Sequence, residues 1–206
     1  MKITHLTPFL QDDAGRVITD LAVGQRAMGY QVTVVSSRTG VPGYANGQTH
    51  LDRLDASGVT TYLADSLFVR DYAANLAVVR LLGDVVGQHD GPDVLHAHGI
   101  AASMIALMYA GRRRRPIGLV HTMHAWHVNK PAAQAVADVH MLNLVDRVVT
   151  SSAHAAAILR GLGVSGGHIR VIPSGVAETQ VEPDNRDRAV LEDMRRARKR
   201  GALVLA

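Results

Sequence analysis

Short apolar segments alternate with helix-like segments from the first residue, and this alternation constrains the fold more than any other feature. Segments rich in β-branched residues predict strands, and segments with helical spacing of apolar residues separate them. Alternation of this kind is typical of right-handed βαβ units. We therefore expect an α/β fold, with a Rossmann-like, doubly wound, mainly parallel sheet and helices on both faces. The expected strands are residues 2–6, 31–36, 59–63, 93–97, 117–122, 147–151 and 168–172.

The segments between these strands predict five helices, and one segment lacks a helical pattern. Residues 38–58 contain turn residues throughout and indicate a long loop or an irregular excursion. Gly29 stands where a glycine ends the first helix, and Pro131 suits the first position of another. The expected helices are residues 16–28, 68–87, 100–110, 131–144 and 152–162.

The character of the chain changes after Ala177. Residues 1–177 are expected to form the Rossmann-like domain. Residues 178–206 read as a polar linker, a charged helix at 189–200 and the first strand of a further sheet. Because no sequence is left to build that sheet, we expect the chain to be part of a longer protein.

Composition excludes several classes of site and protein. The 206 residues include no cysteine, which excludes disulfides, thiolate metal ligands and cysteine nucleophiles. No apolar run reaches the roughly 18 residues that a membrane helix needs, and the N-terminus lacks the pattern of a signal peptide. We therefore expect a cytoplasmic protein. The net charge of +4 weakly favours anionic partners.

Polar and glycine-rich segments follow five of the expected strands. In parallel sheets, ligands bind beyond the carboxyl ends of the strands. We therefore expect one cleft at that end of the sheet. The first of these segments, PFLQDDAG, places Gly15 at a helix start, where backbone N–H groups can approach a phosphate. An ordinary turn capped by Asp13 is an equal alternative.

Histidines gather at two strand ends. His96 and His98 alternate, so both side chains should lie on one side of a strand. With His121, His124 and His127 they offer nitrogen ligands, but no carboxylate stands beside them, and we expect no metal. His96 suits a position packed beneath the cleft, and His121 suits one inside the sheet.

The loop after the fifth strand carries further candidate ligand-binding residues. The other polar residues nearby have structural interpretations. His124 can hydrogen-bond a sugar hydroxyl, and Lys130 can neutralise an anion. Trp126 either stacks on a sugar ring or covers the loop. Ser152 is expected to cap the helix that follows Ser151. The run from Arg112 to Arg115 is expected to be a solvated turn, with peripheral membrane contact as the second reading; we expect no nucleic-acid binding, because aromatic residues are absent nearby.

Several segments, taken in order, resemble the N-terminal domain of GT-B glycosyltransferases of family 4, a retaining group that uses nucleotide sugars. The resemblance covers residues 1–176. It rests on KITHLTPFLQDDAGRVITDLAVGQRAMGYQVTVVSS, DVLHAHG, LVHTMHAWHVNK, DRVVTSSAHAAAIL and HIRVIPSGV.

The resemblance implies roles for individual residues. His124 matches a histidine that approaches the donor sugar, and is the expected catalytic residue. Gly15 matches the second glycine of a pair near the donor diphosphate, while Ala14 replaces the first. Lys130 matches a lysine in a subset of the family, and His98, Trp126 and Ser151 are further candidates for substrate binding. The family's acidic residue after the sixth strand is His154 here, and the Asp of its PNGVD segment is Ala177.

The resemblance also implies an activity. We expect a sugar to pass, with retention, from a nucleoside-diphosphate sugar to an unidentified small-molecule, lipid or glycan acceptor, with no tightly bound cofactor. The family's donor site lies mostly in a C-terminal domain that this chain lacks, so the chain alone should be inactive. Three alternatives stay open: half of a non-hydrolysing sugar-nucleotide epimerase, a degenerate binding or regulatory module, and a metal hydrolase.

Overall fold

The computed structural model describes residues 1–38, 45–65, 67, 70–86, 91–127 and 129–175. It also describes residues 188, 189, 192, 193, 195, 196 and 199. The chain divides into two units, Met1–Pro173 and Ser174–Ala206.

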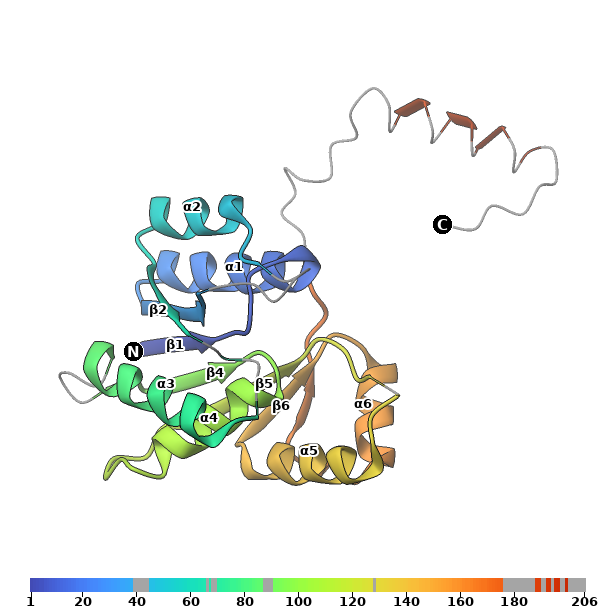
Figure 1. Ribbon diagram of the computed structural model, residues 1–206. Coiled ribbons are helices and arrows are strands. Elements are labelled where there is room, and N and C mark those ends of the chain that lie inside the picture. Colours follow the sequence, from blue (N-terminus) through green and yellow to red (C-terminus); the bar gives the residue numbers. More distant parts are fainter. Residues whose placement is uncertain are drawn as a thin grey trace. The chain divides into compact units, whose positions relative to one another are not determined.

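Unit 1 is built around a seven-stranded sheet in which every paired strand is parallel (Figure 1). The strand order is β3-β2-β1-β4-β5-β6-β7, so the chain winds outward from β1 in one direction, crosses back and winds outward in the other. The strands are β1 (Lys2–Leu6), β2 (Gln31–Ser37), β3 (Thr60–Ala64), β4 (Val94–Ala97), β5 (Gly118–Met123), β6 (Arg147–Thr150) and β7 (Ile169–Val171).

Helices cover the sheet on both faces, as the sequence predicts. Figure 1 shows α1 and α2 on one side of the sheet and α3, α4 and α5 on the other. The helices are α1 (Asp12–Ala27), α2 (Gln48–Ala56), α3 (Tyr72–Val85), α4 (Ile100–Ala110), α5 (Ala132–Leu144) and α6 (Ala153–Gly161). The predicted Rossmann-like, doubly wound fold is confirmed.

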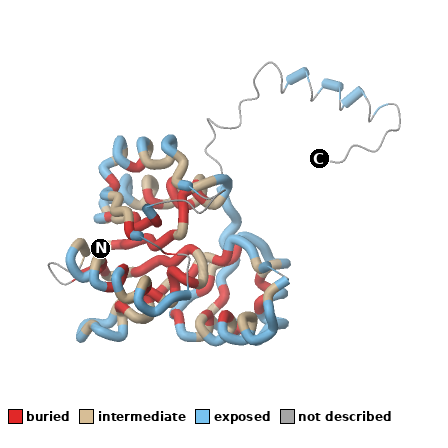
Figure 2. The backbone as a smooth tube through the Cα atoms, in the orientation of Figure 1, coloured by how far each residue is buried: buried red, intermediate tan, exposed pale blue. Residues whose placement is uncertain are grey.

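Two apolar clusters fill the two sides of the sheet. Figure 2 shows that buried residues are concentrated along the strands. The smaller joins α1 and α2 to β2 through side chains such as Ile18, Leu54 and Val34. The larger joins β1, β4, β5 and β6 to α3–α6 through side chains such as Leu95 and Leu142. Because side chains alternate along a strand, Leu95 and Ala97 of β4 belong to the larger cluster, and His96 and His98 lie on the face that α1 covers.

Two element predictions are wrong. The first helix begins at Asp12 rather than at residue 16, because the acidic and small residues before Arg16 form its first turn. The segment 38–58 is not a continuous loop, since α2 occupies Gln48–Ala56 and buries Leu54 completely. A single buried leucine among polar residues gives too weak a periodicity for prediction. Residues 39–44 of this segment lie outside the described residues.

The other predicted elements are present, with boundaries shifted by a few residues. Gly29 adopts a φ of +87° just beyond α1, as expected for a glycine that ends a helix. Pro131 precedes α5 instead of opening it. The predicted start and end of the third helix, residues 68 and 87, lie outside the described residues; its described part begins after Asp71, whose carboxylate accepts a hydrogen bond from the N–H of Ala74.

In unit 2, the described residues between 188 and 199 are helical, and Arg196 pairs with Glu192 and Asp193. The predicted linker, Ala177 and the predicted strand at 201–206 lie outside the described residues. None of the described helices has the length and apolar character needed to cross a membrane.

Candidate functional site

A cleft of about 360 Å³ lies beyond the carboxyl ends of β4 and β5. The loop after β1 contributes Pro8, the turn after β4 contributes His98, and the loop after β5 contributes His124. Three strand ends therefore meet here, as expected for a parallel sheet. The remaining lining residues are Arg70, Gly99, Ile100, Ala101, Thr122, Met123, Ala125, His127, Lys130, Gln134 and Asp138.

His98 and His124 form the polar centre of this cleft. His98 is buried and His124 is exposed. The Nδ1 atom of His98 lies 3.1 Å from the Nε2 atom of His124, so one of the two nitrogens donates a hydrogen bond to the other. Desolvation lowers the pKa of His124, although its outer edge is in solvent. The imidazole of His124 is therefore neutral at neutral pH, with one nitrogen engaged inward and one left for a ligand.

Behind His98, the hydrogen bonds continue into the protein. His98 Nε2 lies 3.1 Å from His5 Nδ1, and His5 Nε2 lies 2.8 Å from the side-chain oxygen of Gln25 on α1. His5 is fully buried on β1, next to His96 in the parallel register of β1 and β4. His5 could not be predicted as part of the site, because a lone histidine in a short strand carries no signal until its neighbour strand is known.

His96 lies beside this chain, packed beneath the cleft. Its ring stacks on His98 with centroids 4.3 Å apart, and its Nε2 lies 2.7 Å from the Thr122 hydroxyl. The prediction that His96 and His98 share one side of the strand is confirmed. Desolvation, with smaller effects of the neighbouring histidines, lowers the pKa of both rings well below the usual value. Burial also lowers the pKa of His5 to about 4.

The histidines of the loop after β5 do not converge on one point. His121 is fully buried, and its Nδ1 lies 2.6 Å from the Ser103 hydroxyl of α4, on the opposite face of the sheet from His96. Burial lowers its pKa to about 3. His124 and His127 instead line the cleft.

Among the described residues, the group with spacing suited to a metal ion is His5, His96 and His98, whose nitrogens lie within 4.8 Å of one another. All three are buried, and no carboxylate belongs to the group. A metal bound to both His5 and His98 would have to replace the hydrogen bond that joins them.

Lys130 lines the cleft, but its ammonium group already contacts Asp138 and the ring of Trp126. Its Nζ lies 2.7 Å from Oδ2 of Asp138 and 3.7 Å from the centroid of the Trp126 ring. Trp126 in turn packs against the larger apolar cluster, so it covers the loop, and it is not among the cleft-lining residues. The second oxygen of Asp138 pairs with Arg70. The role of Asp138 could not be predicted from the sequence, because its position on α5 gives no hint of these two partners.

Gly15 lies outside the residues that line the cleft. It is buried in the first turn of α1, and its N–H donates to the carbonyl of Gln11 at 2.8 Å. A Cβ added to Gly15 would lie 2.6 Å from the carbonyl carbon of Leu10, so the close approach of helix and loop requires glycine. The free N–H groups of this turn, by helix geometry, are those of Asp12, Asp13 and Ala14. Asp13 does not cap the helix and is exposed.

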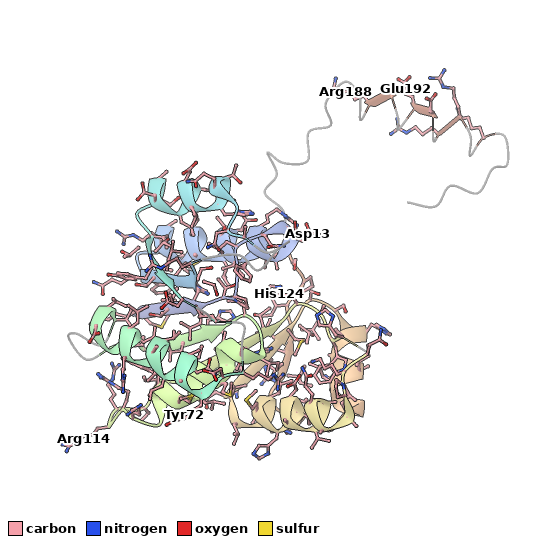
Figure 3. The ribbon with its side chains drawn as sticks, viewed as in Figure 1. Asp13, Tyr72, Arg114, His124, Arg188 and Glu192 are labelled. Atoms are coloured by element: carbon pink, nitrogen blue, oxygen red, sulfur yellow. The ribbon has the colours of Figure 1, made fainter. Side chains whose placement is uncertain are left out.

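Asp13 and His124 nevertheless lie at the same end of the sheet, as Figure 3 shows.

Ser151 follows β6, is exposed and does not line the cleft. Ser152 caps α6 by accepting a hydrogen bond from Ala155 N–H at 3.1 Å, as predicted. The role of Ser151 stays a prediction.

The arginine run occupies the turn between α4 and β5. Arg115 pairs with Asp93, and the Arg113 guanidinium lies 5.6 Å from the centroid of the Tyr109 ring. This turn precedes β5, whereas His124 follows it, so Arg114 and His124 lie at opposite ends of the sheet (Figure 3). Contact of this turn with a membrane stays a prediction.

Solved structures that share this fold include a protein in complex with UDP and glucose and a sucrose-phosphate synthase. HepE (Alr3699) of Anabaena in complex with UDP and glucose superposes with a TM-score of 0.69 at 17% identity, over 94% of this chain and 50% of that chain. Sucrose-phosphate synthase from Thermosynechococcus elongatus gives a TM-score of 0.68 at 16% identity, over 93% of this chain and 53% of that one. This chain therefore spans about half the length of these structures.

An epimerase shares the fold less closely. UDP-N-acetylglucosamine 2-epimerase from Neisseria meningitidis, bound to UDP-GlcNAc, gives a TM-score of 0.54 at 14% identity, over 83% of this chain and 46% of that chain. A comparison with curated proteins gives no match.

The sequence itself matches one family. The profile of Glycosyltransferase Family 4 covers residues 14–180, which include α1 from Ala14 onward, all the strands after β1 and the whole cleft loop after β5. Since the matched residues make up most of the chain and the fold is that of GT-B glycosyltransferases, the chain belongs to Glycosyltransferase Family 4.

Proposed function

We propose that this chain is the N-terminal, acceptor-side domain of a retaining glycosyltransferase of the hexosyltransferase type. The observation that supports this most directly is the exposed imidazole of His124 in a polar cleft at the carboxyl ends of β4 and β5. A neutral imidazole at this place can exchange hydrogen bonds with sugar hydroxyls. His124 is the proposed catalytic residue, and it acts by orienting the donor sugar.

The proposed donor is a nucleoside-diphosphate sugar, used as a co-substrate with no tightly bound cofactor. HepE has been solved with UDP, with UDP and glucose, and with UDP-glucose. Those ligands belong to HepE, and they support the donor class for this chain through the shared family and fold.

In the proposed reaction, the bond between the anomeric carbon and the diphosphate oxygen breaks, and its electron pair leaves with the diphosphate. The acceptor oxygen forms the new bond on the same face of the sugar, and its proton passes to the departing phosphate oxygen. This route needs no carboxylate base from this domain. His124 contributes by orientation and by hydrogen bonds that match the transition state.

The amide of Gly15 is already bonded to Gln11, so its proposed contact with the donor diphosphate is indirect. Glycine at this position lets the first turn of α1 pack closely against the backbone of Leu10, and so fixes the position of that turn. The carboxylates of Asp12 and Asp13 oppose an anion there. We therefore assign most of the diphosphate binding to a second domain.

Acceptor binding is proposed for the cleft in this domain. His98 forms a hydrogen bond with His124. Lys130 lines the cleft and pairs with Asp138, which also pairs with Arg70. The chain spans about half of the similar structures, so we propose that it transfers no sugar without its C-terminal domain.

A nucleotide-release assay with UDP-glucose and other nucleotide sugars tests this proposal. We expect no turnover by the 206-residue chain, and turnover by the complete protein with its C-terminal domain. Turnover by the isolated chain would contradict the proposal that transfer requires a second domain. A product whose anomeric configuration is opposite to that of the donor would contradict retention.

A sugar-nucleotide epimerase is the second candidate, since the Neisseria epimerase shares the fold. Epimerisation requires a group that removes a carbon-bound proton. Among the described residues that line the cleft, Asp138 carries the carboxylate. One of its oxygens is bonded to Lys130 and the other to Arg70, so neither is free for that role. Interconversion of two nucleotide sugars without an acceptor, followed by NMR, would favour the epimerase.

A further inference from the structure

Three imidazoles and one amide form a continuous hydrogen-bonded chain from α1 to the cleft. It runs from the Gln25 oxygen to His5, from His5 to His98 and from His98 to His124, with nitrogen-to-partner distances of 2.8, 3.1 and 3.1 Å. Gln25 is half-buried, His5 and His98 are buried, and His124 is exposed. This chain of hydrogen bonds therefore connects α1 to His124, the candidate catalytic residue.

The imidazoles meet nearly end to end. In the His5–His98 pair and in the His98–His124 pair, the ring centroids are 5.3 Å apart, the nitrogens are 3.1 Å apart and the ring planes differ by 28°. Centroids so much farther apart than the nitrogens require the two nitrogens to point along the line between the rings. The lone pair of one ring therefore faces the N–H of the next, which is the near-linear geometry that a hydrogen bond prefers.

Each neutral imidazole carries one N–H donor and one acceptor nitrogen. A chain of such rings has two possible directions, because the tautomer of one ring fixes that of the next. An acceptor at one end selects the direction: the Gln25 oxygen takes a hydrogen from His5 Nε2, so His5 Nδ1 must accept from His98 Nε2. His98 Nδ1 must then accept from His124 Nε2.

We propose that Gln25, His5 and His98 are positioning residues that hold His124 in the tautomer protonated on Nε2. The nitrogen left for a ligand, Nδ1, is then a hydrogen-bond acceptor, and its partner is a hydroxyl group of the bound substrate. The identity of that hydroxyl rests on the proposed function, but the tautomer does not.

His96 lies beside the chain without belonging to it. It stacks face to face on His98 at 4.3 Å and bonds the Thr122 hydroxyl. This packing holds the plane of the His98 ring, which the end-to-end geometry requires. The low pKa of each ring keeps it neutral at neutral pH, so that the one-donor, one-acceptor rule applies.

Nitrogen NMR of the 206-residue chain labelled with ¹⁵N-histidine tests the proposal, because the two ring nitrogens of each tautomer have different chemical shifts. In the wild type, we expect His124 to be protonated on Nε2. Gln25→Met removes the acceptor and should give a mixture of His124 tautomers. Gln25→Lys replaces the acceptor with a donor and should shift His124 toward protonation on Nδ1.

The exposed His140 of α5 is the internal control, and its tautomer should not change in either variant. Thermal unfolding checks that each variant folds. If Gln25→Lys does not fold, the His124 tautomer in Gln25→Met alone tests the proposal. The proposal is overturned if wild-type His124 is protonated on Nδ1, or if the folded variants leave its tautomer unchanged. Since the readout is a chemical shift, absence of sugar transfer would contradict only the proposed function.

Discussion

Gly15 and Gly24 lie in the same helix, α1, but have different surroundings. A Cβ at Gly15 would meet the Leu10 backbone at 2.6 Å, whereas a Cβ at Gly24 would meet nothing within 4 Å. We expect Gly15→Ala to lower the free energy of unfolding by about 1–3 kcal/mol, the usual cost of overpacking. Gly24→Ala should raise it by about 0.5–1 kcal/mol, because alanine favours helix. Urea unfolding measures both; equal effects would contradict the close packing.

Asp138 is the buried anion between two cations. Asp138→Ala leaves Lys130, whose side chain is 11% exposed, without its carboxylate, and we expect a loss of about 3–5 kcal/mol. Arg70→Ala should cost less, because Arg70 is more exposed and Lys130 still pairs with Asp138. Chemical denaturation of the two variants tests this order, and a larger loss for Arg70→Ala would reverse the account.

Single residues at strand ends were predictable, and contacts between distant elements were not. The positions of His98 and His124 follow from the rule that parallel strands present their carboxyl ends to one cleft. Lys130 pairs with Asp138 of α5, and His124 pairs with His98 from the turn after β4. No local sequence pattern predicts either of these contacts. Gly15 was recognised as a special glycine, but its neighbour Leu10, which explains it, becomes visible only in the fold.

At the scale of the element, α6 depends on the serine that precedes it. Ser152 accepts a hydrogen bond from Ala155 N–H, whereas Ser151 is exposed and is not a cap. Ser152→Ala should therefore cost about 1 kcal/mol, and Ser151→Ala should leave stability nearly unchanged. Thermal melting of this matched pair measures the difference. Equal losses would remove the capping assignment.

The buried histidines of β1, β4 and β5 should make the fold sensitive to acid. Their pKa values lie below the ordinary 6.5, at about 4 for His5 and about 3 for His121. Below pH 6.5 the unfolded chain binds protons that the folded chain does not. Stability is therefore complete above pH 6.5 and falls as pH decreases toward 4, by about 1.4 kcal/mol per pH unit for each such histidine.

Urea unfolding at several pH values between 4.5 and 6.5 measures this slope. Asp93 does not disturb the window, since a backbone hydrogen bond from Lys2 and the contact with Arg115 lower its pKa below 3.8. His121→Gln should reduce the slope by the contribution of one histidine. A flat profile would show that these rings are not buried in the neutral state.

Most elements were predictable because the switch between strand and helix periodicity is local. Helix α2 was missed because only Leu54 of its nine residues is buried, so its apolar face is too narrow to see in the sequence. The start of α1 was missed because the residue types from Asp12 to Gly15 favour turns.

For the whole molecule, the family and the half-length match lead to one expectation: the cleft described here is one wall of an active site that a second domain completes. The prediction that residues 1–177 act as the acceptor-side domain is tested only in the complete enzyme.

The most direct measurement is the turnover of the complete enzyme carrying His124→Ala, with His140→Ala as the control on the exposed face of α5. We expect His124→Ala to reduce kcat by about 10²-fold or more, on the scale of a lost transition-state hydrogen bond, while the melting temperature stays within a few degrees of wild type. His140→Ala should change neither quantity. Near-normal turnover by a folded His124→Ala enzyme would contradict the account, because the cleft at the ends of β4 and β5 would then not be the place where the sugar is transferred.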